Sequence, residues 1–129
     1  MKWLLLLLLA TPAMAETATS TGGLLRWLDK VSGDTEDLEL SVGQSVQRGH
    51  LTIQLDECRY PANDPASDAF AHLTIMDARV TAPVFVGWMI ADSPALSAMD
   101  HPRYDVWVLN CVIPEVDQPP EAPATGDGG

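Results

Sequence analysis

The chain has 129 residues, with 7 lysines and arginines against 18 aspartates and glutamates, and its formal net charge is −11. An acid excess of this size repels phosphate backbones and anionic lipid head groups, which disfavours nucleic-acid binding and electrostatic attachment to membrane surfaces. Its central part, about 90 residues long, is enough for one hydrophobic core and not for two.

The first predicted element is a cleavable secretory signal peptide over residues 1–15. Lys2 supplies a positive charge, Leu4 to Leu9 form an unbroken apolar run, and Ala13-Met14-Ala15 precede Glu16 as a small-x-small cleavage site. This apolar stretch is far shorter than the roughly 20 residues that cross a bilayer as a helix. We therefore expect export to the periplasm and a mature protein that does not span the membrane and carries 6 basic and 18 acidic residues.

Residues 16–23 are small and polar and are expected to be flexible, and residues 24–113 are expected to form a single β domain. Residues 50–56 give the clearest strand pattern, because Leu51, Ile53 and Leu55 alternate with polar residues. The runs 70–76, 84–90 and 104–112 are rich in aromatic and β-branched residues, and 24–31 and 37–42 are shorter candidates. Turn-forming residues separate these runs, at 32–34, 42–44, 48–49 and 61–65.

One short helix is predicted near residues 93–99, because Ser93 can cap it, Pro94 suits its first turn and His101-Pro102 ends it. Residues 114–129 are dominated by Pro, Gly and acidic residues, which predicts a disordered acidic tail. The whole pattern indicates a mainly β fold, either a small antiparallel sandwich or an open barrel.

The chain has two cysteines, Cys58 and Cys111, and in an exported domain they form the only possible intrachain disulfide. A bridge that closes a loop of this length should stabilise the fold by about 4 kcal/mol. Cys58 is out of phase with the inward residues of its strand. Either a bulge intervenes near Glu57, or the bridge lies on the outer face of the sheet.

Several residue groups resemble the exported bacterial family catalogued as domain of unknown function 2155. In the second half these groups are Gly87-Trp88-Met89, Ser93 to Leu96, His101-Pro102, Tyr104 to Val108, and Cys111; in the first half they are Leu28-Asp29-Lys30 with Gly33, Val42-Gly43, Gly49 to Leu51, and Cys58. The resemblance implies a periplasmic location, one compact domain and a paired Cys58 and Cys111. It carries no assigned reaction, so it implies no catalytic residue.

The sequence offers only weak signals for a catalytic site. A His101 base with Tyr104 and Asp105 is disfavoured because neighbouring strand residues point to opposite faces, so His101 or Asp105 is expected to bond loop amides instead. Ser93 lies in no nucleophile elbow and is expected to cap the helix. The three widely spaced histidines form no metal motif, and the acidic residues 34–39 indicate a solvated loop, so neither a metal nor another cofactor is expected.

Trp27 and Trp107 are expected to fill the core, Trp107 because it shares strand parity with Cys111. Trp88 follows Gly87 and precedes the adaptable Met89, which suggests a binding surface.

The leading hypothesis is therefore a non-catalytic periplasmic protein that binds another macromolecule, with an accessory or assembly role at an envelope or membrane complex. The alternative is a small-ligand or glycan-binding module. The candidate binding residues for both are Trp88, Met89, His101 and Tyr104. Hydrolysis at His101 is a third hypothesis.

Overall fold

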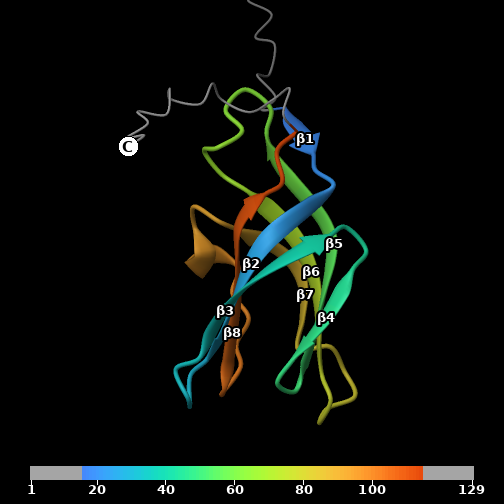
Figure 1. The fold of residues 1–129 in the computed structure, drawn as a ribbon, viewed down its shortest axis with the longest axis vertical. Helices are drawn as coiled ribbons and strands as arrows, with labels where there is room; N and C mark the ends of the chain where they lie inside the picture. Colours follow the sequence, from blue (N-terminus) through green and yellow to red (C-terminus); the bar gives the residue numbers. More distant parts are fainter. Residues whose placement is uncertain (1–15, 115–129) are drawn as a thin grey trace, which may run out of the picture.

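A computed structural model describes residues 16–114, which form two antiparallel β-sheets packed face to face (Figure 1). The strands are β1 (Thr17–Thr19), β2 (Gly22–Asp29), β3 (Thr35–Ser41), β4 (Ser45–Arg48), β5 (Leu51–Pro61), β6 (Phe70–Asp77), β7 (Phe85–Ile90) and β8 (Tyr104–Cys111), with a 3-10 turn η1 (Pro94–Leu96). The mainly β, open antiparallel fold is confirmed. The predicted signal peptide and all but the first residue of the predicted tail lie outside the described residues.

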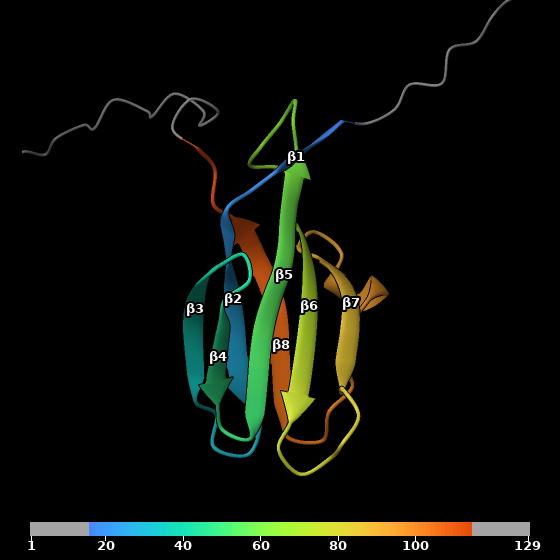
Figure 2. The same cartoon turned by 90° about the vertical axis from the view of Figure 1, so that its right-hand side faces the viewer.

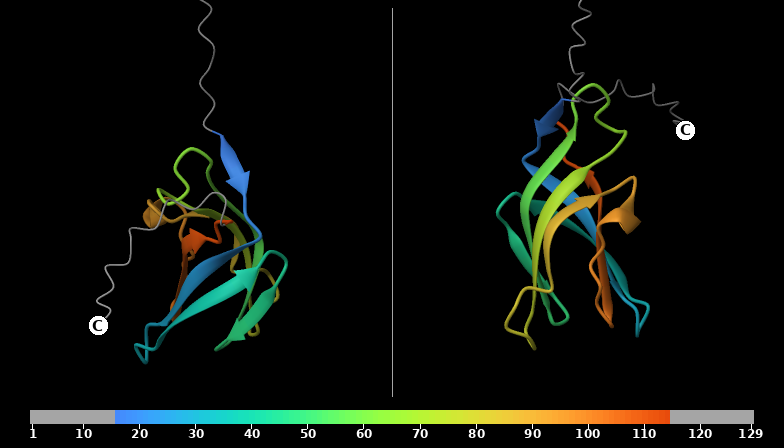
Figure 3. Two further views of the ribbon diagram at one scale, coloured as in Figure 1. Left: turned by 45° about the horizontal axis from the view of Figure 1, so that its top comes forward. Right: turned by 180° about the vertical axis from the view of Figure 1, so that it is seen from behind.

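The larger sheet has the order β1-β5-β6-β7, and β4 pairs with the other end of the β5 edge that β1 uses. The smaller sheet has the order β3-β2-β8. Figure 2 shows β5, β6 and β7 in front of β8 and β2, and the views in Figure 3 show that β7 and β8 lie at neighbouring edges of the two sheets. Between these two edges the sandwich has a seam, along which the segment 91–103 connects the strands.

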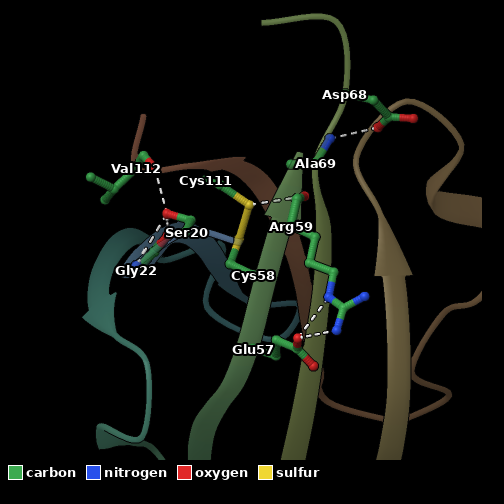
Figure 4. Close-up of a disulfide and its surroundings, with 9 residues drawn as sticks. All are labelled: Ser20, Gly22, Glu57, Cys58, Arg59, Asp68, Ala69, Cys111 and Val112. Carbon is green, nitrogen blue, oxygen red and sulfur yellow. Dashed lines mark hydrogen bonds and ion pairs between the residues drawn. A yellow bond between two sulfur atoms is a disulfide. The ribbon is translucent and has the colours of Figure 1, made fainter. Parts of the chain in front are cut away.

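The core lies between the sheets and follows the predicted alternation, because Leu51, Ile53 and Leu55 are fully buried. The pairing of β5 with β6 then shifts by one residue between Leu55 and Glu57. This bulge turns Cys58 inward, so the first of the two alternatives for the bridge holds. The disulfide joins Cys58 of β5 to Cys111 of β8 and so links the two sheets (Figure 4).

The ordered domain begins earlier than residue 24. Residues 17–19 form β1, which pairs with residues 59–61, and β2 already begins at Gly22. The Ser20 hydroxyl donates to the carbonyl of Val112 and accepts the N–H of Gly22 at 3.2 Å beside the disulfide (Figure 4). The small polar residues of this segment show no hydrophobic periodicity that would predict a strand. Pairing with β5 through backbone hydrogen bonds does not depend on such a pattern.

The predicted helix is shorter than expected. It spans Pro94–Leu96, and Ser93 makes no side-chain capping hydrogen bond, although its carbonyl accepts the N–H of Leu96 at 3.1 Å. Ser97 is already extended, which allows Met99 to enter the core, where it is buried. Burial of Met99 thus ends the turn before a second turn can form. Within residues 16–114 no helix is long and apolar enough to cross a membrane.

Candidate functional site

Strand β7 lies at the edge of the larger sheet, and half of its backbone groups point away from the sheet. Register and the hydrogen bond from the N–H of Ala91 to the carbonyl of Ala69 place Phe85, Gly87 and Met89 in hydrogen-bonded pairs with β6. The backbone groups of Val86 and Trp88 therefore face outward. Among residues 16–114, one backbone hydrogen bond uses this outward side of β7, and it joins the N–H of Ser93 to the carbonyl of Ile90.

The outer face of β7 presents large apolar side chains to solvent. Val86 is 57 % exposed and Trp88 is 38 % exposed. The Trp88 ring is held by two neighbours, because the Arg59 guanidinium lies 5.6 Å from its centroid and the His72 ring lies edge-on at 5.2 Å. Arg59 is itself fixed by an ion pair of 2.6 Å with Glu57 (Figure 4). Trp88 is thus an exposed but positioned aromatic side chain.

A polar group on β5 and β6 supports this face. His72 Nδ1 and the Thr74 hydroxyl both contact Asp56 Oδ2, at 2.8 and 2.7 Å. Asp56 occupies the bulge of β5, which is why its carboxylate can reach both β6 side chains. Thr74 donates to the carboxylate and not to the imidazole, so its hydroxyl is not bonded to the histidine as in a Ser-His-Asp triad. Its geometry orients His72 against Trp88.

An apolar pocket of about 280 Å³ lies in the seam between β7 and β8. Its walls come from the end of β7, the segment around η1, and β8: Met89, Ile90, Pro94, Ala95, Ser97, Ala98, Met99, Asp105, Val106, Trp107 and Val108. Met89 is buried and contributes to the floor, whereas Asp105 is the ionisable group of the wall. A cavity of this size and composition takes an apolar side chain or a small apolar ligand.

Trp107 is a wall of this pocket, and its predicted place in the core is wrong. The pairing of β2 with β8 shifts between Leu24 and Leu25, so Leu109 is an extra residue in β8. Cys111 and Val106 consequently point inward, whereas Trp107 points away from the core and is half-buried. Trp27 does pack in the core as expected, 5.7 Å from the Tyr104 ring.

His101 and Tyr104, two candidate binding residues, lie at the opposite end of the sandwich from the disulfide and are buried. His101 Nδ1 accepts the N–H groups of Arg103 and Tyr104 at 3.0 and 3.1 Å. The ring proton therefore sits on Nε2, which donates to Asp77 Oδ2 at 2.8 Å. The predicted bonding of loop amides is confirmed for His101. The same hydrogen bond to His101 is the main reason why the pKa of Asp77 is lowered.

Asp29 anchors a second polar group at this end. The Arg103 guanidinium donates to its carboxylate at 3.0 Å, and the amides of Val31 and Ser32 donate at 2.9 and 3.3 Å. The bonds from Arg103, followed by those from the two amides, lower the pKa of Asp29 to about 2. Lys30 donates to the carbonyl of His101 at 2.6 Å. These residues fix the turns at this end of the sandwich.

The acidic residues 34–39 are partly neutralised by pairing with neighbouring strands. Arg26 pairs with Asp37 at 2.7 Å and Arg48 pairs with Glu36 at 2.8 Å, and these contacts lower the pKa of both carboxylates. Within the described part of the chain, no three His, Cys, Asp or Glu side chains lie close enough together to hold a metal ion.

The model of a bacterial protein family, described as an uncharacterized protein conserved in bacteria (DUF2155), matches residues 23–111. The chain belongs to the DUF2155 family. It is also similar to the uncharacterized protein RP359 of Rickettsia prowazekii (strain Madrid E), with 27 % identity over 100 residues. That alignment covers 75 % of this chain and 64 % of the Rickettsia protein. No solved structure matches the chain.

Most of the groups that carry the DUF2155 resemblance gather in two parts of the fold, whereas Cys58 and Cys111 form the disulfide at the end opposite His101. Leu28 to Lys30, Gly49 and His101 to Tyr104 meet at the end of the sandwich held by Asp29 and Asp77. Gly87 to Met89, Ser93 to Leu96 and Tyr104 to Val108 surround the seam. Of the four candidate binding residues, the structure keeps Trp88 on the surface and Met89 in the pocket.

Sequence reasoning missed the pocket and the open edge. One signal for the edge was present, since residues 80–91 contain no charged residue in a strongly acidic chain. The pocket has no such signal because its walls meet only after the two sheets pack.

Proposed function

We propose that this DUF2155 protein is an exported, non-catalytic periplasmic protein that binds another macromolecule through the outer face of β7. The observation that carries the proposal is the exposed pair Val86 and Trp88 on an edge strand. Tryptophan is enriched among the residues that dominate binding energy at protein interfaces. The contacts with Arg59 and His72 hold the ring in place and reduce the entropy lost when a partner binds.

The disulfide supports export, because such bonds form and persist in oxidising compartments. The pattern of residues 1–15 points the same way. A small acidic domain with an exposed edge strand supports an accessory or assembly role at an envelope complex.

Affinity capture tests the proposal. The tagged mature protein is exposed to the periplasm and the solubilised membranes of its own host, and bound proteins are identified by mass spectrometry. We expect a stoichiometric partner whose affinity falls about thirtyfold in W88A, because interface tryptophans contribute about 2 kcal/mol or more. V31A is the control, since Val31 is 75 % exposed in the turn after β2, far from Trp88. If no protein is retained above the tag control, the proposal is contradicted.

A small-ligand function is the second candidate, and the pocket of about 280 Å³ favours it. A ligand there contacts Trp107, so titration with cell-wall fragments and small apolar metabolites should change tryptophan fluorescence, and W107F should remove the change. A flat response across the panel rejects this candidate.

A further inference from the structure

The edge strands of the two sheets are protected very unequally. Proteins discourage unwanted pairing at exposed edges with charged side chains, prolines or very short strands. The edge strand β3 carries Glu36, Asp37 and Glu39, the edge strand β8 carries Asp105, and β1 and β4 have only 3 and 4 residues. Strand β7 has 6 residues, none of them charged or proline. It therefore lacks each of these three protections. Two of its apolar side chains, Val86 and Trp88, are also exposed to solvent.

The backbone of β7 is suited to accept another strand. Val86 and Trp88 both direct N–H and C=O groups away from β6, as the pairing pattern requires. These two residues also carry the exposed apolar side chains. An added strand thus gains backbone hydrogen bonds and side-chain contacts at the same positions, which is the usual basis of recognition by β-augmentation.

The surroundings of the seam specify the charge of such a strand. Asp92 and Asp100 are exposed on the segment that follows β7, and neither forms an ion pair with another residue in the range 16–114. Asp105, in the pocket wall, is 41 % exposed and lies 3.6 Å from Lys30. Residues 16–114 contain 14 acidic and 6 basic residues, a net charge of −8. A basic segment is attracted here, whereas a second copy of the chain is repelled.

We propose that β7 binds an extended, basic segment of a partner protein as an added β-strand, with one apolar side chain of that segment in the pocket between β7 and β8. The inference rests on the proposed function and identifies the partner's chemistry. The pocket supplies specificity, because its apolar walls at Met89, Val106 and Trp107 lie next to the edge that the segment would follow. The carboxylate of Asp105 would pair with a neighbouring Lys or Arg of the segment.

The experiment selects binders from a phage-displayed library of short linear peptides, using the oxidised mature protein as bait. Selected peptides, and any partner captured from the host, are then tested against V86P and V86K. Proline removes the outward N–H of residue 86 without breaking a bond to β6, and lysine places a positive charge against a basic strand. The matched controls are A82P in the exposed loop before β7 and V31K in the turn after β2. Thermal unfolding verifies that every variant is folded.

We expect selected peptides that alternate apolar residues with Lys or Arg, and an affinity that falls about tenfold in V86P, as the loss of one hydrogen bond requires, with a similar loss in V86K. A82P and V31K should bind like the wild type. Peptides that bind folded V86P and V86K with unchanged affinity, or a selection that returns no binder, overturn the inference. Concentration-dependent dimerisation that V86P abolishes assigns the edge to a second copy and also overturns it. A host partner that binds V86P normally leaves the proposed function intact and rejects the added strand.

Discussion

At the scale of single residues, buried polar contacts hold the end of the sandwich where β2, β6 and β8 meet. His101 is 5 % exposed and uses both ring nitrogens, and Asp29 accepts bonds from Arg103 and two amides. These contacts fix the turns at this end of the sandwich.

Asp29 should make the free energy of unfolding depend on pH in the acid range. Its pKa is about 2 in the folded protein against 3.8 in the unfolded chain. The contribution of Asp29 to the free energy of unfolding is therefore present above pH 3.8 and is lost as the pH falls through about 2. We expect the urea midpoint of the wild type to fall more steeply between pH 4 and pH 2 than that of D29N. D37N should keep the wild-type slope more closely, because its ion pair with Arg26 is exposed and screened. Equal slopes for wild type and D29N contradict the assigned role.

At the scale of elements, strands with clear alternation or β-branched residues were predictable, and β5, β6, β7 and β8 lie within one or two residues of the expected starts. The three turn glycines, Gly33, Gly43 and Gly49, all adopt positive φ as turn chemistry requires. The short strands β1 and β4 were missed, because polar residues become strands only when a partner edge is present. The parity of Trp107 was missed because the extra residue in β8 depends on its pairing with β2.

The turn between β4 and β5 is fitted closely against β8. Gly49 has φ +57°, and a Cβ there would lie 2.6 Å from Cζ of Tyr104. G49A should therefore lower the free energy of unfolding by about 3 kcal/mol or more, because it adds overpacking to backbone strain. G33A is the matched control, since Gly33 has φ +80° and open space around it, and it should cost about 1 kcal/mol. Equal losses in urea denaturation would show that the Tyr104 contact is unimportant.

At the scale of the whole molecule, the sequence indicated a disulfide-closed open β domain but not where its seam lies. Strand order decides which edges remain unpaired, and strand order depends on contacts between residues far apart in the chain. Residues 80–91 carry no charged side chain, but only the topology shows that the strand within them is an edge.

The disulfide closes the sandwich at the end where β1 and the end of β8 meet. Cys58 and Cys111 are separated by 53 positions, so the double variant C58A/C111A should lose about 4 kcal/mol of unfolding free energy. The two sheets should still form, since the core between them is continuous. Equilibrium denaturation and far-ultraviolet circular dichroism measure the two expectations. A loss below about 1 kcal/mol would contradict the chain-entropy argument.

The most direct test of an open β7 edge is residue-resolved amide hydrogen exchange, measured by NMR in the free protein and with the captured partner. In the free protein we expect Gly87 and Met89 to be protected, because their amides bond to β6, and Val86 and Trp88 to exchange rapidly. Binding of the partner should protect Val86 and Trp88 as well. Equal protection of all four amides in the free protein, or no added protection on binding, would contradict the account.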